Sequence, residues 1–161
     1  MAKAVKKKKA APKKATVSVP KKRQIQFCID FSLFADNTVL GPNFALAGFQ
    51  FTQAAGGPNM FVNVTAGEQG LQFPSAGMKI KLASPATSVT MRAGTFAGPF
   101  NVIASDSSGT QVASRAVNFG NAYGNVTLAT TGNPITTLAF TGGGNEGILV
   151  QLCIRFVCVS P

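Results

Sequence analysis

The residue types of this chain argue against catalysis. It has no histidine and only five Asp and Glu residues, so neither a Ser-His nor a Cys-His nucleophile pair can be assembled. Five acids also leave little for the paired acid and base that glycoside hydrolysis uses. The sequence therefore predicts a protein that is not an enzyme, and its chemistry points to binding.

A metal site is the first binding chemistry to consider. If the first and last strands of the domain are neighbours, Asp30, Asp36 and Glu146 come together. Loop oxygens near Asn43 and residues 142–144 would then complete a calcium shell. Asp30 and Glu146 are the candidate metal ligands, and calcium is the one cofactor that the sequence suggests. The plainer interpretation is that these acids are turn and cap carboxylates.

The three cysteines are Cys28, Cys153 and Cys158. The last two are five residues apart, which on a strand turns them to opposite faces. Without histidine, a zinc site made of three cysteines lacks its fourth ligand. Buried reduced thiols are the simplest interpretation, and a disulfide between Cys28 and Cys153, joining the first and last strands, is the alternative.

A glycine run near the end of the chain formally matches a nucleotide-binding fingerprint. Residues 142–147 read GGGNEG, but the G-x-G-x-x-G fingerprint needs a helix after it to hold the pyrophosphate. The following residues, 148–154, read ILVQLCI and are rich in types that favour strands. We expect a glycine-rich turn between the last two strands.

Positive charge is concentrated at the start of the chain. Residues 1–23 hold ten Lys and Arg and no acid, so the net charge of +10 belongs to this arm and the rest of the chain is neutral. Because Lys, Ala and Pro offer little apolar surface and like charges repel, we expect disorder. Such an arm binds DNA or RNA phosphates by releasing counterions; a solubilising extension or a localisation signal is the alternative. The candidate nucleic-acid-binding residues are Lys6, Lys7, Lys8, Lys9, Lys13, Lys14, Lys21, Lys22 and Arg23.

The aromatic residues are thirteen Phe and one Tyr. Phe residues on one face of alternating strands predict core. Tyr123, in the segment GNAYG that reads as a loop, is the candidate residue for stacking on a ligand.

The stretch from residue 89 to 117 shows most clearly how the chain is built. The first two of its three segments alternate in their side chains with the period of two expected of strands, which predicts paired strands. Phe100, Val102 and Ala104 share one face of the middle segment. The sequence DSSG at residues 106–109 has Asp and Gly where a type I turn prefers them, so the last two segments predict a hairpin.

The rest of the chain extends this pattern. Residues 25–31 alternate as a first strand, residues 44–51 predict a second strand with a bulge at Gly48, and residues 148–159 form a long last strand. No segment has a helical period, and the chain has 17 Gly and 9 Pro. We predict an all-β fold, an antiparallel β-sandwich of jelly-roll type over residues 24–161, preceded by the disordered lysine-rich arm at residues 1–23.

Several short segments resemble a known family. CIDF at residues 28–31, GTFAGP at 94–99, ASDSSG at 104–109 and GNEG at 144–147 resemble a bacterial β-sandwich family that is similar to galactose-binding-like and carbohydrate-binding domains. The resemblance covers roughly residues 25–156. It implies a jelly-roll sandwich and, in some relatives, an acidic calcium site near the paired end strands, which Asp30 and Glu146 fit. Separately, the arm resembles histone H1-like tails and the basic arms of small viral coat proteins.

These observations predict a non-enzymatic binding or structural module. Its neutral body binds a glycan, a protein partner or further copies of itself as a homo-oligomer, and its arm engages a polyanion such as nucleic acid. The alternatives are a self-assembling coat protein whose arm packages nucleic acid, and an accessory domain of a hydrolase. No apolar run of signal length follows the lysines, and residues 148–159 are too short to span a membrane. We therefore expect no membrane span and, by default, a cytoplasmic protein.

Overall fold

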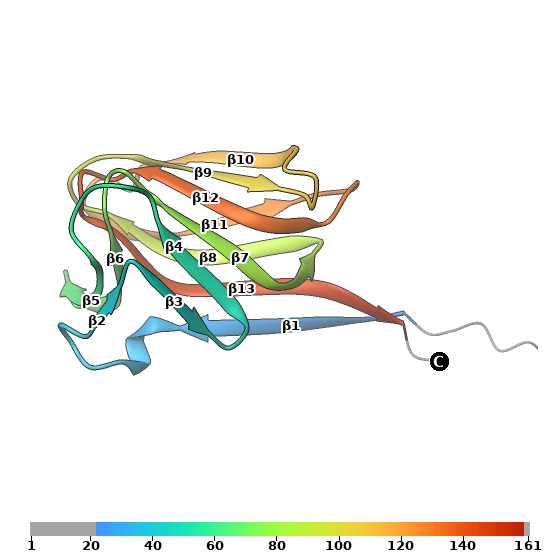
Figure 1. The fold of residues 1–161 in the computed structure, drawn as a ribbon, viewed down its shortest axis with the longest axis horizontal. Coiled ribbons are helices and arrows are strands. Elements are labelled where there is room, and N and C mark those ends of the chain that lie inside the picture. The colour runs from blue at the N-terminus through green and yellow to red at the C-terminus, as the bar shows by residue number, and fades with distance from the viewer. Residues whose placement is uncertain (1–21, 160–161) are drawn as a thin grey trace, which may run out of the picture.

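The computed structural model describes residues 22–159 as two stacked antiparallel sheets (Figure 1). Apart from one 3-10 turn, its elements are strands, because alternating residues bury one face of each segment. In chain order the elements are β1 Lys22–Asp30, η1 Phe31–Leu33, β2 Val39–Gly41, β3 Asn43–Leu46, β4 Phe49–Gln53, β5 Met60–Thr65, β6 Glu68–Phe73, β7 Met78–Ala86, β8 Ser88–Thr95, β9 Phe100–Ser105, β10 Gln111–Val117, β11 Ala122–Ala129, β12 Ile135–Gly142 and β13 Gly147–Val159.

The two sheets confirm the predicted antiparallel β-sandwich of jelly-roll type. Sheet A has seven strands in the order β11-β8-β13-β6-β5-β2, and its seventh strand, β1, pairs with β13. Sheet B has six strands in the order β10-β9-β12-β7-β4-β3. Most of the arm lies outside the described residues; β1 begins at Lys22, before the domain boundary predicted at residue 24.

Strand β13 is the centre of sheet A. Its first residues, Gly147 to Leu149, pair with β6, and the remainder pairs with β1 along the same side. On its other side it pairs with β8, with a register shift between Leu149 and Gln151. The first and last strands of the described chain are therefore neighbours, as the sequence predicted.

A disulfide joins these two strands. Cys28 and Cys153 are paired in the β1–β13 register and are bonded to each other, with a sequence separation of 125. Of the two interpretations of the cysteines, reduced thiols are therefore wrong for this pair and the disulfide is confirmed. Cys158 is free and partly exposed.

The predicted hairpin is β9 and β10. The backbone N–H of Gly109 donates to the carbonyl of Asp106 at 3.1 Å, which closes the predicted turn. The buried Asp106 carboxylate accepts hydrogen bonds from Ser108, Thr110 and Asn133. Those from Ser108 and Asn133 contribute most to lowering the pKa of Asp106 to about 2.

Two predictions of strand pairing need correction. Strand β8 belongs to sheet A and pairs with β11 and β13, so it is not paired with the β9–β10 hairpin. The strand predicted at residues 44–51 is a hairpin of β3 and β4. Ala47 and Gly48 both have positive φ, 49° and 86°, so Gly48 makes a tight turn where we had predicted a bulge.

The core fills the space between the sheets. Six Phe side chains are fully buried there, which confirms their predicted role: Phe31, Phe49, Phe51, Phe73, Phe100 and Phe140. The glycine run at residues 142–147 forms the turn from β12 into β13, as predicted; Gly142, Gly143 and Gly144 all have positive φ, a conformation that side chains disfavour.

The hairpin allows a test of strand register. Val102 is 0% exposed, whereas Ile103 on the opposite face is 36% exposed. We expect Val102→Asp to unfold the domain, because a buried unpaired charge costs several kcal/mol against a total stability of roughly 5–15 kcal/mol. Asn101→Asp and Ile103→Asp should remain folded. Circular dichroism and solubility of the three variants check this, and a folded Val102→Asp would refute the register.

The disulfide allows a test of how the ends of the chain are held. Because the bond closes a loop of 125 residues, its loss in Cys28→Ser should lower the free energy of unfolding by about 2–5 kcal/mol. Chemical denaturation with and without reductant measures the change. Reductant should destabilise the unmodified protein and leave Cys28→Ser unchanged; a reductant-insensitive protein would contradict the pairing.

Candidate functional site

Four polar side chains form a row across the outer face of sheet A. The strand registers place Asp30 of β1 opposite Gln151 of β13, Gln151 opposite Arg92 of β8, and Arg92 opposite Asn125 of β11. Their neighbours along the strands, such as Leu152, point into the core. We call these four residues the polar row.

Hydrogen bonds fix the β1 end of the polar row. Gln151 Nε2 donates to Asp30 Oδ2 at 3.0 Å. Asp30 is the N-cap residue of η1, and its Oδ1 accepts from the backbone N–H and the hydroxyl of Ser32. Burial works to raise the pKa of Asp30, but the hydrogen bonds from Ser32 and Gln151 outweigh it and hold the pKa below its usual value. Asp30 is therefore a fixed, ionised acceptor.

Arg92 is held by a carboxylate from the β5–β6 hairpin. Its guanidinium binds Glu68 through two hydrogen bonds, one of them from Nε to Oε2 at 2.6 Å. The hydrogen bonds from Arg92 lower the pKa of Glu68, and the same contact raises that of Arg92. This is the only ion pair among the described residues. It orients Arg92 and neutralises its charge.

Tyr123 lies beside the polar row, and its hydroxyl is held by two backbone carbonyls. Its hydroxyl donates to the carbonyls of Thr65 at 2.9 Å and Glu68 at 3.2 Å. The Arg92 guanidinium carbon is 5.8 Å from the ring centroid. Burial, followed by the charge of Glu68, raises the pKa of Tyr123 to about 12, so the phenol remains protonated and keeps donating.

A glycine makes room for this ring. A Cβ added to Gly94 would lie 2.6 Å from Tyr123 Cε1 and 2.6 Å from Phe96 Cε2, so the ring rests directly on the β8 backbone. Phe96 meets Tyr123 edge to face at 5.0 Å between centroids. Tyr123 lies in β11, so the prediction that it is in a loop was wrong. Its predicted role in stacking on a ligand stays a prediction.

The other predicted metal ligands are spread over the molecule. Asp36 accepts hydrogen bonds from the backbone of Asn37 and Val64, and Glu146 lies in the turn before β13. Within residues 22–159 no three acids or cysteines gather in a way that could hold a metal ion, so Asp30, Asp36 and Glu146 do not form the expected shell. Calcium binding by Asp30 and Glu146 alone stays a prediction.

Most of the candidate nucleic-acid-binding residues of the arm precede the part of the chain that the structure describes. Lys6, Lys7, Lys8, Lys9, Lys13, Lys14 and Lys21 lie outside the described residues, and Lys22 and Arg23 begin β1.

No described helix has the length and apolar character needed to cross a membrane.

Sequence reasoning missed three members of the polar row: Arg92, Asn125 and Gln151. Each is a polar residue in an alternating strand and so could be assigned to an outer face. Nothing in the chain showed which strands were neighbours, however, and the row exists only through the registers of β1, β13, β8 and β11.

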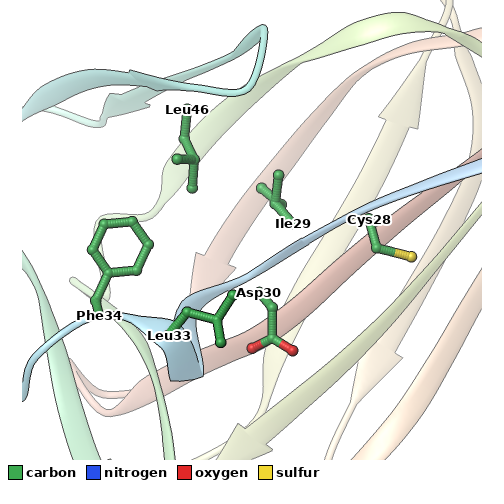
Figure 2. A pocket seen from close by; sticks show the side chains of 6 residues that line it. All are labelled: Cys28, Ile29, Asp30, Leu33, Phe34 and Leu46. Atoms are coloured by element: carbon green, nitrogen blue, oxygen red, sulfur yellow. The ribbon is translucent and has the colours of Figure 1, made fainter.

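A hollow lies where β1 ends, between the two sheets (Figure 2). It has a volume of about 360 Å³ and is lined by Cys28, Ile29, Asp30, Leu33, Phe34 and Leu46. Leu46 comes from β3, the border strand of sheet B, and the other residues come from β1, η1 and the residue that follows η1. Leu33 is 84% exposed at its border.

No protein-family model and no curated protein matches this chain. Among solved structures it is similar to a mutant of a family 29 carbohydrate-binding module, at 13% identity over 84% of this chain and 92% of that one, with a TM-score of 0.47. Another mutant module of family 29 gives 14% identity over 84% and 89%, with a TM-score of 0.46. A family 6 module from Clostridium stercorarium, solved with cellobiose, gives 18% identity over 70% and 95%, with a TM-score of 0.34.

Proposed function

We propose that this protein is a non-enzymatic module that binds a glycan on the outer face of sheet A. The observation that carries the proposal is the polar row, in which a carboxylate, two amides and a guanidinium lie side by side on adjacent strands. Asp30, Asn125 and Gln151 offer acceptors and donors at fixed spacing, which suits the hydroxyl groups of a sugar.

The ring of Tyr123 supports the same ligand class. Because sugars have apolar C–H faces, a glycan site gains from an aromatic ring beside its hydrogen-bonding groups. Tyr123 is held by two carbonyls and rests on Gly94, so little conformational entropy remains to be lost when a ligand stacks on it.

The charges of this face favour a neutral ligand over a polyanion. Arg92 is paired with Glu68, and Asp30 is an ionised carboxylate held by Ser32 and Gln151. Around the polar row, a phosphate chain would meet at least as much negative as positive charge. The open outer face of a sheet also suits an extended polysaccharide, whereas a small ligand is usually enclosed. An accessory domain of a hydrolase would use this face in the same way.

The test compares two asparagines on opposite outer faces. Both Asn125, in the polar row, and Asn101, on sheet B, are exposed. Asn125→Ala should weaken binding of the full chain to a neutral polysaccharide by roughly fivefold, because one lost hydrogen bond is worth about 1 kcal/mol. Asn101→Ala should leave binding unchanged. Affinity electrophoresis in gels containing neutral mannan or glucan polymers measures the effect.

Failure of the full chain to bind any neutral polysaccharide in the panel would contradict glycan binding. Equal weakening of binding by Asn125→Ala and Asn101→Ala would show that the glycan does not bind at the polar row. Gln151→Ala, at the other half of the row, should reproduce the effect of Asn125→Ala.

The division of charge favours a second activity, polyanion binding by the arm. Residues 1–23 carry the entire net charge of +10, and the body is neutral. Flexible lysines contact phosphates as point charges without reading sequence. Because the basic residues Lys22 and Arg23 begin β1 whereas Asp30 of the polar row ends it, we propose that the two activities are separate.

Removal of the arm tests this. Deleting residues 1–21 removes eight of the ten basic residues and leaves β1 intact. Affinity for duplex DNA, RNA or heparin should be lost while the melting temperature stays nearly unchanged. If about five charges engage duplex phosphates, log K should fall with log salt at a slope of roughly −4 to −5 in the full chain. Undiminished binding by the truncated protein would contradict the proposal.

A further inference from the structure

Strand β1 lies at a border of sheet A (Figure 1). Within residues 22–159 it pairs with β13 and with no other strand. It is nine residues long. An unpaired strand edge offers backbone donors and acceptors to another chain, and a long edge offers many of them. Proteins usually shorten, bend or cover such an edge.

The disulfide shows which backbone groups face outward. The Cα atoms of Cys28 and Cys153 are 4.0 Å apart, the short spacing of a pair that exchanges no backbone hydrogen bonds in an antiparallel ladder. Cys28 therefore directs its N–H and C=O away from β13. Because the pattern repeats every second residue, Gln24 and Gln26 do the same.

Apolar side chains line the same border. Ile25 is 36% and Phe27 is 38% exposed, although both point to the core side of the sheet. Phe27 stacks on Phe49 of β4 at 5.8 Å, but one flank of its ring remains open. These two residues continue the apolar row of Ile29, and sheet B covers them only in part. The unpaired backbone edge of β1 and the side chains of Ile25 and Phe27 together form a surface on which another strand can pair.

We propose that a second copy of this chain docks here, with β1 pairing antiparallel to β1 of that copy about a twofold axis at Gln26. In this register Gln26 lies opposite Gln26 of the second copy. The outward N–H and C=O groups of Gln24 form hydrogen bonds with those of Cys28 in the second copy. Phe27 of each copy lies beside Ile25 of the other, an aromatic and β-branched pair of the kind that stabilises sheets.

The charges of β1 select a second copy in this orientation. Its sequence begins with Lys22 and Arg23 and ends with Asp30. An antiparallel pair places position 22 of one copy opposite Asp30 of the other. A parallel pair would place like charges together at both ends, which is destabilising. The strand is therefore complementary to itself in one direction.

The dimer extends sheet A through both copies, so the outer faces that carry the two polar rows become one surface. The pairing uses backbone groups, the charges at the two ends of β1 and the core-side residues Ile25 and Phe27. Of the polar row it meets Asp30 alone, and it leaves Gln151, Arg92 and Asn125 uncovered. The dimer and the proposed glycan site can therefore be tested separately.

The experiment measures the mass of the full chain by light scattering after size exclusion, in elevated salt to screen the arms. All proteins carry Cys158→Ser, because that free thiol could join two copies covalently. We expect twice the chain mass of 16.6 kDa. Gln26→Pro removes an outward N–H without breaking the ladder to β13, so it should give a monomer, and Gln26→Ala should remain a dimer.

A second pair of variants guards against misfolding of Gln26→Pro. Ile25 and Ile103 are equally exposed, at 36%, but Ile103 lies on the outer face of sheet B. Ile25→Lys should give a monomer and Ile103→Lys a dimer, both with the circular dichroism of the parent. A monomeric parent protein would overturn the proposal, and so would a dimer that survives both Gln26→Pro and Ile25→Lys.

Discussion

The fold depends on the position of β13 in the middle of sheet A. This last described strand pairs with β8 on one side and with β6 and then β1 on the other. A single long strand thus joins segments from the beginning, middle and end of the chain. The pairing with β8 shifts register between Leu149 and Gln151, and the side chains of Leu149, Leu152 and Ile154 remain buried on either side of this shift.

The same registers divide the surface of the molecule by chemistry. The outer face of sheet A holds hydrogen-bonding side chains tied to one another, such as Gln151 to Asp30 and Arg92 to Glu68. The outer face of sheet B holds exposed Lys79 and Lys81, together with the exposed apolar Ile103. Because charge, hydrogen bonding and free strand edge lie in different places, the arm, the polar row and β1 can each serve a different partner.

Local chemistry was predictable and neighbour relations were not. Alternation correctly separated Val102 from Ile103, and DSSG correctly closed a hairpin, because both depend on residues close in sequence. The hairpin turn at Gly48 was missed because Ala47 adopts a positive φ that its side chain disfavours. The polar row was missed because it depends on pairing between strands far apart in sequence, and alternation shows the face of a strand without identifying its neighbour.

The antiparallel pairing of β1 with β13 also determines how the domain bears mechanical load. Lys22 lies opposite Val159, so both ends leave the fold at the same end of this ribbon (Figure 1). A force that pulls the ends apart would unzip the ribbon one residue pair at a time, which requires little force. Unzipping stops at the covalent bond between Cys28 and Cys153. Residues 29–152 lie inside the closed loop, so tension passes through the disulfide and bypasses the sandwich and its polar row.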